Sequence, residues 1–174
     1  MAQVKNNQKL IFFWSLIGLA TILFLVLMIY MGVKVTKYTS TSQLKQLKTT
    51  QVFTQKANSD GNYYVWFYSS ETPTEQQEAV TKAILTYASY VKTHKSATPI
   101  YAVNVDNGQN STCMTKTGTT SMDSVTAWGG FTLNWNDVSC LVTVTVSDTG
   151  TTYSTSNALT TEMDILSLLD TSMN

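Results

Sequence analysis

Residues 63–75 have the sequence Tyr-Tyr-Val-Trp-Phe-Tyr-Ser-Ser-Glu-Thr-Pro-Thr-Glu, and this stretch decides the fold. Its first six residues are all aromatic or β-branched, which is typical of a central strand buried on both faces. A helix start follows, because Thr72 can be the N-cap, Pro73 the first helical residue and Glu75 the partner that completes a capping box. We therefore expect a strand at 63–68 that runs directly into a helix.

Apolar residues recur at helical spacing after this start, so one face of the expected helix should be buried. The only histidine, His94, follows the helix and is expected to be a solvated residue at its end. The positions on the apolar face are Ala79, Val80, Ala83, Ile84, Tyr87, Ala88 and Val91.

The remaining patterns predict an α/β domain with a central mixed sheet and flanking helices. A strand, a helix and a second strand at this spacing should form a right-handed parallel crossover. After the second strand the chain is irregular, with one short helix expected near residues 122–128. The expected elements are strands at 100–105 and 141–146, a hairpin return at 151–154, and a last helix at 161–170.

The N-terminal part of the chain predicts a single transmembrane helix. Residues 10–33 hold 24 residues without a charge, enough to cross a hydrocarbon core of about 30 Å. Trp14 and Tyr30 lie near its ends, where aromatic side chains favour the membrane interface. A cleaved signal peptide would have a shorter apolar stretch and small residues at a cleavage site. The expected organisation is a tail at 1–9, the membrane helix at 10–33, a stalk at 34–56 and one domain at 57–174.

The orientation of this anchor has two opposing indications. More lysines follow the span than precede it, and the positive-inside rule then favours a cytoplasmic domain. However, a short tail before a first span resembles a signal anchor, and long domains translocate largely regardless of flanking charge. We expect a single-pass protein of the cell membrane with an extracellular C-terminal domain.

Composition argues against several kinds of ligand. The chain has 11 lysines, no arginine and 11 acidic residues, and from Tyr38 onward 7 lysines face 11 acids, a net charge of −4. Nucleic-acid binding needs clustered basic residues, so no nucleic-acid partner is expected. One histidine and scattered aspartates predict no metal site, and no cofactor motif is present.

The order of elements and the junction at 63–76 resemble the thioredoxin fold, in the form of membrane-tethered thioredoxin-like proteins of Gram-positive bacteria. The resemblance covers residues 52–169. In that family the core strand runs into a Cys-x-x-Cys motif, and its two cysteine positions fall here on Thr72 and Glu75. Pro73 and Thr74 stand between them, and Ser139 stands where the family has a cis-proline. The resemblance therefore implies the fold without the motif.

Loss of the motif bears directly on activity. A thiol-disulfide oxidoreductase needs an attacking thiolate at the helix start and a resolving thiol beside it. Threonine and glutamate supply neither, so we expect a non-enzymatic interaction or assembly domain. Its partners would be other proteins of an envelope machine, such as a secretion, conjugation or bacteriocin-export apparatus.

Cys113 and Cys140 leave three alternatives open. They enclose 26 residues, and a disulfide that closes such a loop contributes about 3–4 kcal/mol to stability. We expect this structural disulfide. Two free buried thiols and a relocated redox dithiol are the alternatives. The last would make the chain a membrane-bound oxidoreductase.

Two further hypotheses concern the irregular segment and the overall class. Trp128, Phe131 and Trp135 either pack beneath a long loop or form a partner-binding surface, where aromatic residues are favoured.

A pilin-like subunit would also have an apolar N-terminal helix. That class expects a prepilin processing site and an acidic residue early in the helix, and neither is present.

Overall fold

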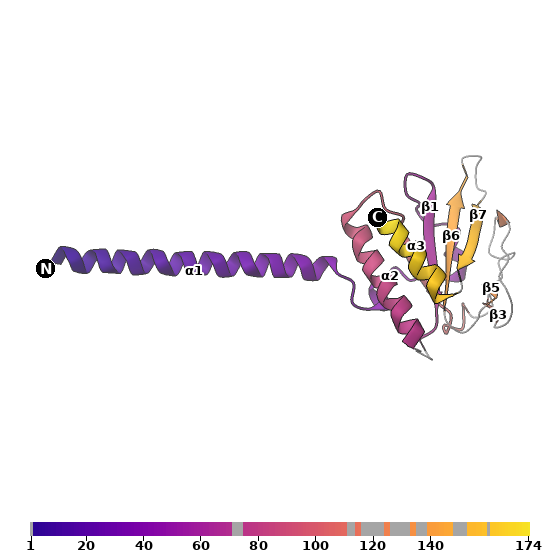
Figure 1. The fold of residues 1–174 in the computed structure, drawn as a ribbon, viewed down its shortest axis with the longest axis horizontal. Coiled ribbons are helices and arrows are strands. Elements are labelled where there is room, and N and C mark those ends of the chain that lie inside the picture. The colour runs from indigo at the N-terminus through magenta and orange to yellow at the C-terminus, as the bar shows by residue number, and fades with distance from the viewer. Residues whose placement is uncertain are drawn as a thin grey trace. The chain divides into compact units, whose positions relative to one another are not determined.

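The computed structural model of the chain divides into two compact units, Met1–Lys37 and Tyr38–Asn174. Figure 1 shows the helix of the first unit and the sheet and helices of the second. The residues that the structure describes are 2–70, 75–110, 114–115, 124–125, 133–134, 139–147, 153–159 and 161–174.

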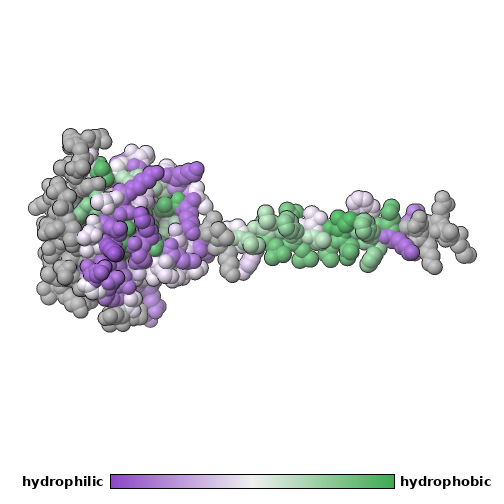
Figure 2. Space-filling view, turned by 180° about the vertical axis from the view of Figure 1, so that it is seen from behind, coloured by the Kyte–Doolittle hydropathy of each residue, from purple (hydrophilic) through white to green (hydrophobic). Residues whose placement is uncertain are grey.

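The first unit is one continuous helix, α1, at Ala2–Thr36. Its segment Asn7–Gly32 is long and apolar enough to cross a membrane, and none of it is buried against the protein. Figure 2 shows apolar side chains along this helix and mostly hydrophilic ones on the coloured part of the face of the second unit that is in view. The helix begins at Ala2, so most of the predicted N-terminal tail is helical as well.

The second unit is built around strand β1, which pairs with β2 in parallel and with β6 in antiparallel orientation. The sheet order is β2-β1-β6-β7-β4, and β3 and β5 form a separate parallel pair. Because α2 joins β1 to β2, the predicted parallel crossover is confirmed. Figure 1 shows α2 and α3 lying side by side. The bounds are β1 Asn62–Tyr68, α2 Glu75–Thr93, β2 Ile100–Asn104, β3 Met114–Thr115, β4 Ser124–Val125, β5 Leu133–Asn134, β6 Ser139–Val146, β7 Tyr153–Leu159 and α3 Glu162–Met173.

Strand β1 is buried on both faces, as its uninterrupted apolar sequence predicts. Its odd-numbered side chains join one hydrophobic cluster, together with alternate residues of β6. Its even-numbered side chains join a second cluster beneath α2 and α3. The predicted apolar face of α2 supplies Val80, Ile84, Tyr87 and Ala88 to this second cluster, and all four are buried.

The segment 38–56, predicted as a stalk, is instead part of the domain. Leu47 is buried, and its amide donates to the Ala102 carbonyl at 2.8 Å, beside a parallel bridge between Gln46 and Ala102. The Tyr63 hydroxyl donates to the Val52 carbonyl at 2.8 Å. The apolar residues of this segment are separated by polar ones at irregular intervals, so no helix or strand period marks them as buried.

The segment begins at a defined contact. The Tyr38 amide donates to Ser89 Oγ at 2.8 Å, and the Lys92 ammonium lies 3.7 Å from the centre of the Tyr38 ring. The domain therefore starts at the residue that follows the first unit, with no separate stalk.

Three further differences concern the predicted elements. Strand β6 begins two residues before the predicted strand, and β7 extends five residues beyond the predicted hairpin return. Ser124–Val125 is a short strand that pairs with β7, where a short helix was expected. A strand of two residues is too short for the spacing of its apolar residues to distinguish a strand from a helix.

Candidate binding site at the carboxyl ends of the parallel strands

Strands β1 and β2 end at the same edge of the sheet, and polar residues lie just beyond both ends. In open α/β sheets, ligands bind outside the carboxyl ends of such strands. Ser69 and Ser70 follow β1, while Asp106 lies two residues beyond the end of β2. The chain also enters α2 at this edge, which makes the edge a candidate binding site.

Asp106 joins the two strand ends. Ser69 Oγ donates to Asp106 Oδ1 at 2.7 Å. The backbone amide and Oγ of Ser70 donate to Oδ2 at 2.5 and 2.8 Å. Asn104, the last residue of β2, accepts from the Asp106 amide at 2.9 Å and donates to Ser70 Oγ at 3.3 Å. The start of the β1–α2 loop is thereby attached to the end of β2 by charge-assisted hydrogen bonds.

The start of α2 is attached to the same loop. The Gln77 side chain is buried, and its amide group donates to the Ser69 carbonyl. Glu75, the first residue of α2, is exposed. Thr72, Pro73 and Thr74 lie outside the described residues, so the predicted cap stays a prediction.

Ser139 lies opposite Tyr68 at the start of β6 and is fully buried. The rings of Trp66 and Tyr68 stack with their centres 4.4 Å apart on the same face of the sheet. Ser139 Oγ and Trp66 Nε1 are buried without a hydrogen-bond partner in the described part of the chain. A buried polar group left without a partner costs roughly 1–3 kcal/mol.

Cys140 lies on the opposite face of β6 from Ser139. It is a free thiol, fully buried in the cluster that contains Phe67 and Val142. Burial raises the pKa of the Cys140 thiol to about 12. The predicted Cys113–Cys140 disulfide is therefore not shown by the structure, and Cys113 itself lies outside the described residues.

A cavity of about 530 Å³, lined mostly by residues with polar side chains, opens beside the strand ends, between them and the segment 41–48. We call it the edge pocket. Its walls are already hydrogen bonded, since the Tyr68 hydroxyl donates to Gln46 Oε1 at 3.3 Å and Asn110 Nδ2 donates to the Asn104 carbonyl at 2.9 Å. It is lined by Thr41, Ser42, Gln46, Leu47, Lys48, Tyr68, Ser70, Asn104, Asn107 and Asn110.

Sequence reasoning missed this pocket, because half of its wall comes from the segment assigned to a stalk. The aromatic candidates Trp128, Phe131 and Trp135 lie outside the described residues.

His94 is exposed at the end of α2, and its ring stacks on Tyr90 with the centres 3.8 Å apart. Among the described residues, no group of three histidine, cysteine or acidic side chains is placed to hold a metal ion.

No protein family model, curated protein or solved structure matches this chain.

We predict that Asp106→Asn lowers the free energy of unfolding by about 2 kcal/mol, because a neutral amide replaces the acceptor of charge-assisted hydrogen bonds from Ser69 and Ser70. Urea unfolding of the full chain in detergent micelles, followed by tryptophan fluorescence, measures the change.

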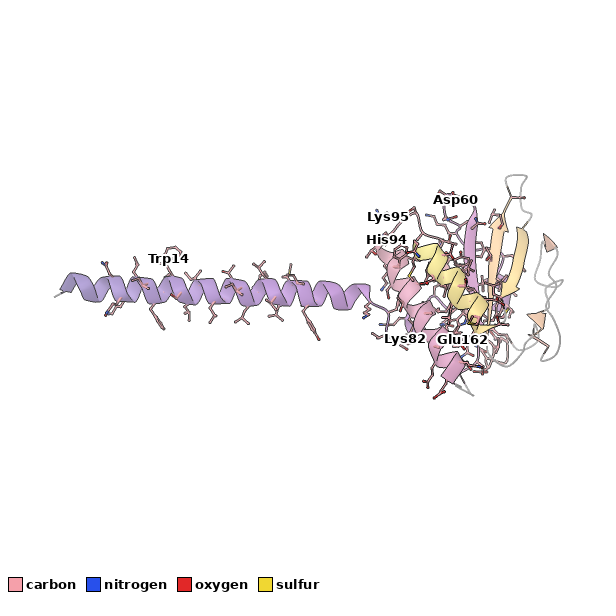
Figure 3. The ribbon with its side chains drawn as sticks, in the orientation of Figure 1. Trp14, Asp60, Lys82, His94, Lys95 and Glu162 are labelled. Atoms are coloured by element: carbon pink, nitrogen blue, oxygen red, sulfur yellow. The ribbon has the colours of Figure 1, made fainter. Side chains whose placement is uncertain are left out.

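The matched control is Asp60→Asn. Asp60 is exposed, and its hydrogen bond to Asn58 uses the backbone amide. Figure 3 shows Asp60 at the same end of the domain as Lys95, away from Lys82 and Glu162. This variant should change the unfolding free energy by less than about 0.5 kcal/mol. Equal losses in both variants would contradict the structural role of Asp106.

Proposed function

We propose that the chain is a membrane-anchored, redox-inactive thioredoxin-like domain that binds other proteins of the cell envelope. One observation carries the proposal: the chain forms a strand–helix–strand unit, an antiparallel hairpin beside its first strand and a closing helix, which is the order expected from the resemblance, and the sequence has no thiol at the junction between the first strand and its helix. The strand order β2-β1-β6-β7 and the placement of α2 and α3 support the fold assignment.

The chemistry of the junction supports binding over catalysis. Disulfide exchange begins with attack by a thiolate, and the motif positions hold Thr72 and Glu75. The described thiol, Cys140, is buried, and burial raises its pKa to about 12, so the protonated thiol rather than the thiolate is the dominant form at neutral pH. It also lies on the face of β6 opposite to Ser139.

The strand-end edge supports a binding role. Its polar side chains are fixed by hydrogen bonds to one another. Examples are the bond from the Ser70 amide to Asp106 and the bond from Asn110 to the Asn104 carbonyl in the wall of the edge pocket. A preorganised surface loses little conformational entropy when a partner binds.

The apolar helix supports the anchor. A core helix of a soluble protein would bury one face, whereas the apolar side chains of Asn7–Gly32 are exposed throughout. We propose that this segment spans the membrane and that the domain is extracellular. A length of 26 residues corresponds to about 39 Å of helix, enough for a bilayer core of about 30 Å.

The first test is catalytic. The purified full chain in detergent should reduce insulin no faster than its Cys113→Ser, Cys140→Ser variant, because no thiolate is available at the helix start. A rate that disappears in the double variant would replace this proposal with a membrane-bound oxidoreductase. The insulin-turbidity assay, run beside an active dithiol oxidoreductase, gives the scale.

The second test is topological. Protease added to intact cells, after removal of the cell wall, should degrade a tag at the C-terminus and leave a tag at the N-terminus intact. The reason is that a helix that crosses the membrane once, with the proposed orientation, leaves the C-terminal domain outside the cell and the N-terminus inside. Protection of the C-terminal tag, with cleavage after the membrane is permeabilised, would instead place the domain in the cytoplasm.

A further inference from the structure

We propose that the edge pocket binds a carboxylate of an acidic peptide, with Lys48 as the charged contact. This inference rests on the proposed function, because the peptide would belong to the bound partner protein.

The backbone of Lys48 is held in place on both sides. The Leu47 amide donates to the Ala102 carbonyl at 2.8 Å, and the Thr49 amide donates to Asn110 Oδ1 at 3.2 Å. The Lys48 amide itself donates to Gln51 Oε1 at 3.1 Å. Leu47 and Thr49 are buried, whereas Lys48 is exposed. A fixed backbone thus presents a solvent-accessible ammonium group at the pocket.

The ammonium group of Lys48 is available for a ligand. Within the described part of the chain, it has neither an ion-pair nor a hydrogen-bond partner. Lys45, three residues earlier, is different: its Nζ donates to Gln55 Oε1 at 2.7 Å and lies 5.2 Å from the centre of the Tyr101 ring. Lys45 does not line the pocket, so the chain offers a matched lysine for comparison.

The other groups around the pocket favour an acceptor ligand. No carboxylate is among the described residues that line it, and Lys48 is the charged side chain there. Asn107 Oδ1 already accepts from the Gln109 amide at 3.3 Å, which leaves the Asn107 side-chain amide to donate. Asp106 lies outside the lining, and its oxygens accept from the serines after β1. Charge-assisted hydrogen bonds from an ammonium group to a carboxylate are the stronger kind.

The size and floor of the pocket fit a short peptide segment. Its volume of about 530 Å³ lies within the range of roughly 300–1,000 Å³ usual for ligand sites. Leu47 and Tyr68, both mostly buried, provide apolar contacts for the carbon atoms beside a carboxylate. The pocket thus combines one cation, neutral donors and an apolar floor.

The experiment uses the isotope-labelled full chain in a non-ionic detergent micelle, with amide chemical shifts followed by NMR. The probes are acetyl-Gly-Glu-Gly-amide, its Gln counterpart, and acetyl-Gly-Gln-Gly with a free C-terminus, which separates a side-chain carboxylate from a terminal one. The Glu peptide should shift the amides of Lys48 and Asn107 and bind at least fivefold more tightly than the Gln amide. Added salt should weaken it, because the contact is exposed to solvent.

Matched variants complete the test. Lys48→Gln should reduce the affinity for the Glu peptide to that for the Gln peptide, and Asn107→Ala should weaken it by a smaller factor. Lys45→Gln should leave it unchanged. Equal binding of the Glu and Gln amides, equal effects of the two lysine variants, or no shift at the pocket would each overturn the proposal. Such a failure concerns the pocket alone, whereas cysteine-dependent insulin reduction would refute the proposed function without changing the peptide result.

Discussion

The burial of β1 on both faces is the constraint on which the rest of the domain depends. Trp66 and Tyr63, the largest fully buried side chains, point to opposite faces of this strand. Each large apolar side chain gains roughly 1.5–3 kcal/mol from burial, so both faces must be covered. Helices α2 and α3 cover one face, and the segment 47–57 contributes to the cover of the other. The same segment also provides a hydrogen-bond acceptor for a tyrosine hydroxyl, since the Tyr101 hydroxyl donates to the Lys56 carbonyl at 2.9 Å.

The same constraint explains what the sequence predicted and what it did not. An uninterrupted aromatic run and a helical apolar face are local signals, so β1, α2 and their parallel crossover were predicted. The burial of 38–56 depends on contacts with residues far along the chain, such as the bond from Tyr63 to Val52, and no local period records them. Asp106 and Gln77 were missed for a related reason. Their partners are loop residues whose proximity follows only from the pairing of β1 with β2.

The polar groups at the strand ends and the described thiol lie in different parts of the fold. The chain places hydroxyl, amide and carboxylate groups where β1 and β2 end, and it fixes them by hydrogen bonds to one another. The described thiol is buried on the other face of β6, where the apolar surroundings hold it in its protonated form. An edge of this kind suits recognition, because its groups are oriented in advance and none of the described ones is a nucleophile of raised reactivity.

The most direct measurement is site-specific photo-crosslinking of the full chain in living cells. A photo-reactive residue replaces Asn107 at the edge pocket, or Asp60 at the other end of β1 as the control; both positions are exposed. The account predicts a discrete crosslinked partner from position 107 that is absent from position 60 and persists in the Cys113→Ser, Cys140→Ser background. Equal crosslinking at both positions, no crosslink at 107, or a crosslink that requires the cysteines would contradict it.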